Sequence, residues 1–148
     1  MATFAAKKVI EIIVADIKEN FDPGIDIKVY NFFGLELEKI SEKFFKANSI
    51  IVVYEGADYE TKTNISVDHP LLLHFLVVEQ LVATATKEKY LFDHFRDFIA
   101  WREFTGLTEE YAELSPEPFF PDRERLYDRY SGIMIWLFSG QLNMEKKL

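Results

Sequence analysis

Three apolar runs, far apart along the chain, constrain the fold more than any other feature of the sequence. They are Ser49–Tyr54, Leu71–Val82 and Tyr130–Phe138. The first is rich in Val and Ile, which favour strands, and a continuously apolar strand needs cover on both of its faces. We therefore predict a mixed sheet in which the strands near Ile51, Val77 and Ile135 are central, with helices packed against it.

The run Leu71–Val82 is long enough for a helix as well as for a strand, and periodicity alone does not separate the two. We favour a strand through residues 75–78, because the Thr-Ala-Thr sequence at residues 84–86 then forms a link to the next helix. Apolar and polar side chains alternate over Ile25–Tyr30, which predicts a half-buried strand there as well.

Amphipathic segments between these runs predict about three helices. In the first, Ile10, Ile13 and Ile17 recur at the three- and four-residue spacing of one helix face. The predicted helices are Phe4–Asn20, Leu35–Lys46 and, approximately, Lys87–Phe104. We expect Thr86 to cap the last helix and Gly106 to end it.

Two further segments are predicted to lack regular structure. Leu114–Pro121 holds three of the five prolines, so we expect it to be extended and irregular. The tail Gln141–Leu148 is charged, and we expect it to fray. Because the sequence shows no internal repeat and no boundary, residues 1–148 are predicted to form a single α+β domain. That domain has one mixed β-sheet flanked by about three helices.

A polar stretch, Glu55–Asp68, lies between two of the apolar runs and has strand-like residues but little to bury. We interpret it as a long hairpin arm or a mobile loop. An arm that adds nothing to the core is often functional, so we expect it to contact another subunit or a partner. A plain mobile hairpin is the alternative. The candidate interface residues are Glu55, Asp58, Tyr59, Glu60 and Lys62.

Charge and composition argue against several classes of protein. The formal net charge of −8 disfavours binding to nucleic acid, which needs Lys and Arg to displace counterions. The absence of cysteine excludes disulfides and thiolate chemistry. The start of the chain lacks the order of a signal peptide, and the longest apolar stretch is too short to span a bilayer. We therefore expect synthesis in the cytoplasm, with no membrane partner and no sequence-specific nucleic-acid partner.

No group of residues predicts catalysis, and we expect no catalytic residue, cofactor or metal. The six glycines are scattered singly, so no phosphate-binding loop is present. His94 with Asp93 and Asp97 could mimic a metal pair, but a solvated helix face explains them without a metal. His74 lies inside an apolar run, where a hydrogen-bonded core histidine is commoner than a catalytic base.

Two charged runs, Glu109–Glu113 and Asp122–Arg125, carry enough carboxylates for acid–base chemistry. The sequence places no partner near either run, and we interpret both as solvated loops. The sequence therefore predicts a protein that is not an enzyme and that works through its surfaces.

Three pieces of the chain, taken in order, carry a resemblance that covers most of its length. The first is the amphipathic opening helix, followed by a strand and a second helix. The second is the strand that ends in Tyr54-Glu55-Gly56-Ala57, followed by the polar arm and the apolar strand from Leu71. The third is a helix over Tyr90–Gly106, a proline-bearing loop and the closing strand that contains Tyr130–Ile135. This order resembles the tail terminator family of Mu-like, contractile-tailed bacteriophages.

The resemblance implies a structural virion protein at the head–tail junction. Such a protein is a subunit of a hexameric ring that caps the tail tube, halts its polymerisation and joins the tail to the head-side connector. The implied partners are further copies of the chain, tube and sheath proteins, and neck or connector proteins. A ring of this kind needs no active site and no cofactor.

Three alternatives stay open from the sequence. One is another ring protein of a phage neck or of a contractile injection system. A second is a small α+β enzyme that uses His74 or His94 with a carboxylate, which a shared pocket for the two histidines would support. A third is an adaptor that binds a peptide along an exposed sheet edge.

Overall fold

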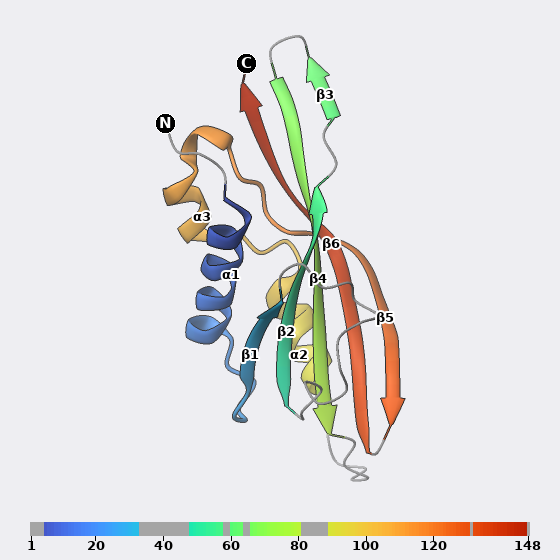
Figure 1. Cartoon of the computed structure of the whole chain (residues 1–148). Coiled ribbons are helices and arrows are strands. Elements are labelled where there is room, and N and C mark those ends of the chain that lie inside the picture. Colours follow the sequence, from blue (N-terminus) through green and yellow to red (C-terminus); the bar gives the residue numbers. More distant parts are fainter. Residues whose placement is uncertain are drawn as a thin grey trace.

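The computed structural model describes residues 5–32, 48–57, 60–63, 66–80, 89–130 and 132–147. Within these ranges the chain forms one six-stranded sheet and three α-helices (Figure 1). The strands are β1 (Lys28–Phe32), β2 (Ser49–Ala57), β3 (Glu60–Thr63), β4 (Ser66–Gln80), β5 (Phe120–Tyr130) and β6 (Ile133–Lys147). The helices are α1 (Ala6–Asn20), α2 (Leu91–Ile99), α3 (Thr105–Glu110) and the 3₁₀ turn η3 (Ala112–Leu114).

The sheet is mixed, which confirms the predicted α+β class. Its strand order is β1-β2-β4-β6-β5, with β3 paired to β4 off this path. β1 runs parallel to β2, and the other pairs are antiparallel. The inner strands β2, β4 and β6 contain Ile51, Val77 and Ile135, so the prediction of three central strands is confirmed.

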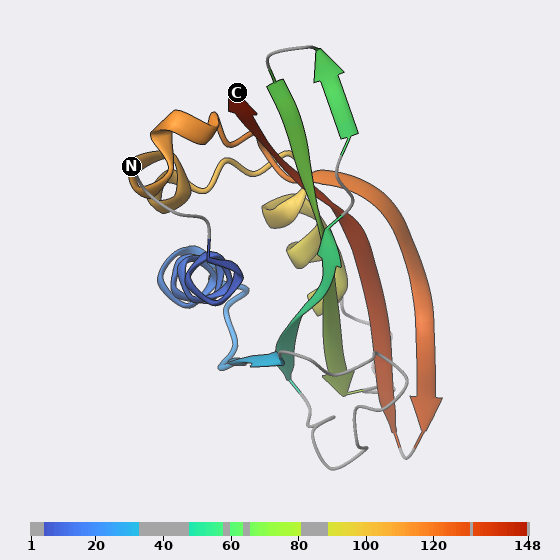
Figure 2. The same cartoon turned by 45° about the horizontal axis from the view of Figure 1, so that its top comes forward.

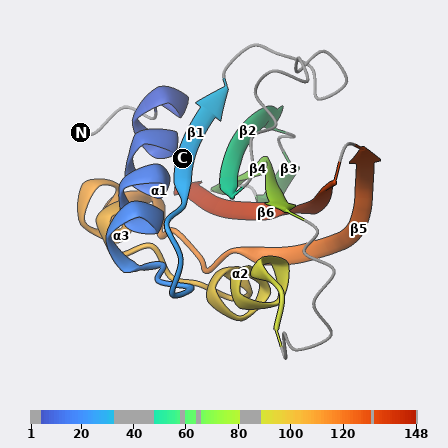
Figure 3. The ribbon, with the colours of Figure 1, turned by 90° about the horizontal axis from the view of Figure 1, so that it is seen from below.

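One face of the sheet is covered by the helices. On β4, the alternating residues Leu71, Leu73, Phe75 and Val77 are fully buried in one cluster with the apolar sides of α1 and α2. Ile10, on α1, belongs to the same cluster, as the helix periodicity predicts. Figures 2 and 3 show α1, α2 and α3 on the same side of a twisted sheet.

The other face of the sheet carries a second, separate apolar cluster. It consists of Ile51, Val53, Leu76, Val78, Ile135 and Leu137, all buried. Tyr30, Tyr127 and Ile133 pack against it, and none of its described members comes from a helix. The inner strands are therefore buried on both faces, which explains why their sequences are continuously apolar.

The predicted helix at Lys87–Phe104 is shorter in the structure. α2 ends at Ile99, and Trp101 adopts a left-handed backbone conformation with φ of 58°. The Trp101 N–H donates to the Phe119 carbonyl (3.0 Å), and the Phe119 N–H donates to the Arg102 carbonyl (2.9 Å). These bonds turn the chain toward the start of β5, which is why the helix does not continue.

Other boundaries also differ from those predicted. Gly106 lies inside α3 and does not end a helix, and β1 begins three residues later than the strand predicted at Ile25–Tyr30. Thr86, residues 87–88 and the helix predicted at Leu35–Lys46 lie outside the described residues.

The C-terminal third holds two strands where the sequence predicted one. The run Asp122–Arg125, interpreted as a solvated loop, lies in β5 and pairs with β6. The tail predicted to fray continues β6 as far as Lys147 and pairs with the first half of β4. Both errors have one cause, because the strands are held by backbone hydrogen bonds that polar composition does not reveal. The irregular segment predicted at Leu114–Pro121 is confirmed only for residues 115–119.

The polar stretch after β2 forms a hairpin, one of its two predicted forms. β3 pairs with the beginning of β4 through Glu60 with Asp68, Thr61 with Val67, and Thr63 with Ser66. Figure 1 shows β3 and the adjoining ends of β4 and β6 extending past the helices.

Candidate binding pocket on the face opposite the helices

A pocket of about 360 Å³ lies on the sheet face that carries the second apolar cluster. Four neighbouring strands, β2, β4, β6 and β5, each contribute to it. The side chains that line it include Glu55, Leu72, His74, Asp122, Arg123, Arg125, Ser139 and Gln141. A cavity of this size can hold a small ligand or a protruding side chain.

His74 lies at the centre of a line of hydrogen-bonded side chains, Glu55–His74–Ser139, that crosses three strands. It stands directly opposite Ser139 in the β4–β6 ladder, and its Nδ1 lies 2.7 Å from the serine Oγ. Its Nε2 lies 2.5 Å from a carboxylate oxygen of Glu55. The imidazole is 14% exposed and the Glu55 side chain 55% exposed, so the line runs from the interior toward solvent.

A β-bulge in β2 places Glu55 in this line. Tyr54 pairs with Leu73 and Gly56 with Leu72, which leaves Glu55 as the extra residue. Gly56 has φ of 142°, a conformation that glycine adopts without a side-chain clash. Bulges commonly re-aim a side chain next to a functional site. The sequence signal was the pair Glu55-Gly56 directly after an apolar strand.

The hydrogen-bond partners determine which ring nitrogen carries the proton when His74 is neutral. An ionised Glu55 carboxylate can only accept, so Nε2 must carry the ring proton. Nδ1 then accepts a hydrogen bond, and the Ser139 hydroxyl donates it. The three polar side chains therefore satisfy one another, and the serine oxygen keeps lone pairs that can accept from elsewhere.

Two arginines of β5 form the outer wall of the pocket. Arg123 is opposite Ser139 and Arg125 opposite Leu137, so both lie on the face of His74. Neither arginine has an ion pair with another of the described residues, although the Arg125 guanidinium lies 5.6 Å from the Tyr127 ring. The pocket thus contains two arginines that form no ion pair within the described ranges, and the carboxylates of Glu55 and Asp122 line it as well.

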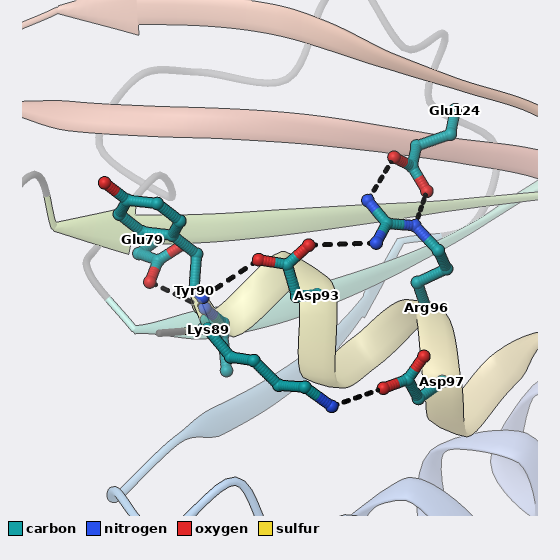
Figure 4. A network of polar contacts seen from close by, with 8 residues as sticks. Glu79, Lys89, Tyr90, Asp93, Arg96, Asp97 and Glu124 are labelled. Carbon is teal, nitrogen blue, oxygen red and sulfur yellow. Dashed lines mark hydrogen bonds and ion pairs between the residues drawn. The ribbon is translucent and has the colours of Figure 1, made fainter. Parts of the chain in front are cut away.

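The intervening residue of β5, Glu124, faces the other way and joins the helix layer. Its carboxylate accepts two hydrogen bonds from Arg96 of α2, from Nε and Nη2, both at 2.6 Å (Figure 4). The bond to Glu124 raises the pKa of Arg96, so this guanidinium stays charged. Glu79, buried at the end of β4, accepts from the Leu91 N–H at 2.7 Å and so satisfies the first turn of α2.

The carboxylates around His94 have partners in this network. Asp93 accepts from Arg96 at 2.9 Å and from the Tyr90 N–H at 3.0 Å. Asp97 accepts from Lys89 at 2.9 Å, and this bond lowers the pKa of Asp97. Among the described residues no three His, Asp or Glu side chains are grouped as metal ligands.

The structure places the predicted site residues in different regions. Glu55 lies in the pocket, whereas Glu60 and Lys62 lie on β3 in the hairpin. Asp58 and Tyr59 lie outside the described residues.

The two histidines considered for catalysis share no pocket, because His74 and α2, which carries His94, lie on opposite faces of the sheet. Glu109, Glu110 and Glu113 are exposed on α3 and η3, away from the pocket lining. The sequence alone does not identify Ser139, Arg123 and Arg125 as members of a common site. Their grouping depends on strand register, which no local pattern in the sequence specifies.

No protein-family model matches the chain, and no curated protein matches it significantly. None of the helices in the described part of the chain is long and apolar enough to cross a membrane.

Proposed function

We propose that this chain is a structural virion protein, a tail terminator whose subunits form a ring that caps a phage tail tube and joins the tail to the head-side connector. The resemblance in segment order supports this proposal, and so does the α+β fold with one mixed sheet. One structural observation carries it furthest, namely a three-stranded projection with two open edges.

The projection arises from the length of β4 and β6. Each strand has 15 residues, which corresponds to about 50 Å, whereas a 15-residue helix such as α1 spans about 22 Å. The paired segments 66–68 and 145–147 therefore extend beyond the helix-covered core, which still includes Met144, and β3 adds a third strand to them.

Both edges of this projection are open within the described chain. In the described chain β3 pairs only with β4. The pairing of β6 with β5 stops at Gln141 and Phe120, and the Asn143 carbonyl still accepts from the Glu117 N–H (3.0 Å), so the outer edge of β6 is open from Glu145 onward. Open edges present unpaired N–H and C=O groups that can add a strand from another chain. If the edge of one subunit contacts a different surface of the neighbouring subunit, the interface is heterologous. Subunits joined by such an interface can form a closed ring. The net charge of −8 suits a ring through which DNA passes without adhering.

The test is to remove the projection and measure assembly. Replacing residues 58–70 by Asn-Gly joins Ala57 to Leu71, which are paired in the sheet, through a two-residue turn. A second variant ends the chain after Met144 and removes part of the other edge. A control variant, Glu109→Ala with Glu110→Ala, changes exposed residues of α3.

Sedimentation velocity and co-sedimentation with purified tail tubes report the outcome. We expect the intact chain and the control to form rings and bind tubes, and both shortened variants to stay monomeric with a nearly unchanged thermal midpoint. Rings of the shortened variants that still cap tubes would show that the projection is not the contact. If the intact chain is monomeric at every concentration and does not co-sediment with tail tubes, the terminator function itself is refuted. Binding to connectors but not tubes would favour another neck ring protein.

The Glu55–His74–Ser139 line favours a second candidate, a small α+β enzyme. A serine hydroxyl that donates to an imidazole, itself held by a carboxylate, is the arrangement of an activated nucleophile. The directly opposite positions of His74 and Ser139 also explain the contact as an ordinary cross-strand pair. A fluorophosphonate probe separates the two candidates, since labelling of Ser139 that is lost in His74→Ala favours an enzyme.

A further inference from the structure

The pocket brings together two arginines that form no ion pair with the rest of the described chain. Arg96 and Arg102 are each held by a carboxylate, Glu124 and Asp16 respectively, through two hydrogen bonds. Arg123 and Arg125 have no such bidentate partner in the described part of the chain, although the full sequence has a net charge of −8. Alternate residues of a strand share a face at about 6–7 Å, so the two guanidinium groups act on one volume.

The remaining lining favours a single negative charge in that volume. Gln141 adds an amide that can donate a hydrogen bond to a carboxylate oxygen. Glu55 and Asp122 also line the pocket, so its formal charge with both arginines is close to zero. Because the charges of the lining sum to about zero, a dianion such as phosphate would gain little attraction there and would lose more hydration than a monoanion. A carboxylate also matches the planar fork of arginine.

We propose that this pocket binds a carboxylate group, held by Arg123 and Arg125 and oriented by the Gln141 amide. One oxygen of the Glu55 carboxylate is already bonded to His74, and within the described chain neither Glu55 nor Asp122 forms an ion pair with these arginines. The same chemistry can come from a free small carboxylate or from an acidic side chain of a second copy of the chain. The inference does not depend on the proposed tail function.

Binding is tested with N-acetyl-glutamate amide, whose only charge is one side-chain carboxylate. Its neutral counterpart, N-acetyl-glutamine amide, and inorganic phosphate serve as comparison ligands. The readout is the change in NMR shifts of the backbone amides of Ser139 and Gln141 and of the Arg123 side chain. We expect saturable shifts with the glutamate derivative and none with the glutamine derivative. Arg123→Gln with Arg125→Gln should weaken binding at least about tenfold.

The matched control is Arg129→Gln, on the same strand and exposed but outside the pocket lining. It should bind the glutamate derivative like the unaltered chain. Equal shifts with both derivatives, equal loss in Arg129→Gln, or tighter binding of phosphate would overturn the proposal.

Sedimentation of the same variants identifies the source of the carboxylate. If a second copy supplies it, Arg123→Gln with Arg125→Gln lowers the assembly state and the glutamate derivative competes with assembly. If a free ligand supplies it, assembly is unchanged while binding of the derivative is lost. Either result supports the pocket, and a failure of assembly in the unaltered chain bears only on the tail function.

Discussion

His74 on β4 stands directly opposite Ser139 on β6, with the imidazole Nδ1 2.7 Å from the serine Oγ. The two residues are 65 positions apart in sequence, and their contact follows from the register of the two longest strands. Glu55 extends the contact to β2 through the bulge at its end. One polar line thus joins the three central strands on the face that the described helices do not cover.

Removing the Ser139 hydroxyl should cost the energy of one partly buried hydrogen bond. We expect Ser139→Ala to lower the free energy of unfolding by about 1 kcal/mol, because His74 Nδ1 loses its donor. Ser139→Thr keeps a hydroxyl, and threonine is favoured in strands, so its free energy of unfolding should be closer to that of the unaltered protein. Urea denaturation measures both, and equal losses for the two variants would show that the hydrogen bond contributes nothing.

Replacing Glu79 should lower the free energy of unfolding more than replacing Ser139 does, because Glu79 is almost fully buried and binds the first turn of α2. Glu79→Ala removes the acceptor of the Leu91 N–H and should cost about 1–3 kcal/mol. Glu79→Gln keeps an acceptor oxygen but loses the charge at the helix N-terminus, so we expect a smaller cost. Amide exchange at Leu91 should accelerate most in the alanine variant. Unchanged exchange there would mean that Glu79 does not support the helix.

The central strands could be predicted because a continuous run of apolar residues indicates burial on both faces. A run such as residues 50–53, with no polar side chain, is stable only where both sides are covered, and the structure covers both. β5 could not be predicted in this way. As an outer strand it carries Arg123 and Arg125 on one face and Glu124 on the other, so its sequence has no apolar alternation.

The sequence predicts one feature of the pocket, the hydrogen bonding of His74, but not the residues that surround it. His74 was expected to be a hydrogen-bonded histidine inside an apolar run, and both of its ring nitrogens do have partners. The identity of these partners depends on strand register and on the bulge at Glu55. Register is set by the whole sheet, so a local pattern cannot place Ser139 or the β5 arginines beside His74.

The pair Lys89–Asp97 predicts a local pH dependence on α2. The hydrogen bond from Lys89 lowers the pKa of Asp97, and the same bond raises the pKa of Lys89. The stabilising contribution of Asp97 is therefore present above the ordinary carboxyl pKa and is lost as the pH falls through the lowered value. Both side chains are exposed, so salt should weaken the effect.

Carbon-detected NMR titration of the Asp97 carboxyl measures this shift. In Lys89→Met the pKa of Asp97 should rise toward that of an ordinary aspartate, while Lys18→Met, on α1, should leave it unchanged. A pKa of Asp97 that is the same in all three proteins would mean that the ion pair does not form in solution.

Gly140 should be the least replaceable glycine that lies in a described strand or helix. A Cβ at this position would collide with the Phe120 carbonyl oxygen and would lie 2.5 Å from Cζ of Phe119. The collision is with backbone, in the ladder that joins β5 to β6, so it can be relieved only by separating the strands. We expect Gly140→Ala to cost about 3 kcal/mol, near the upper end for overpacking.

The matched comparison is Gly106→Ala, where a Cβ would lie 2.8 Å from Cγ2 of Ile12, a side-chain methyl that can shift. Alanine also gains about 1 kcal/mol over glycine inside a helix such as α3, so this variant should stay within about 1 kcal/mol of the unaltered protein. Thermal and urea denaturation of the two variants, measured side by side, give the difference. If Gly140→Ala were as stable as Gly106→Ala, β5 could not approach β6 as closely as the structure places it. In that case the arginine wall of the pocket would lie farther from His74.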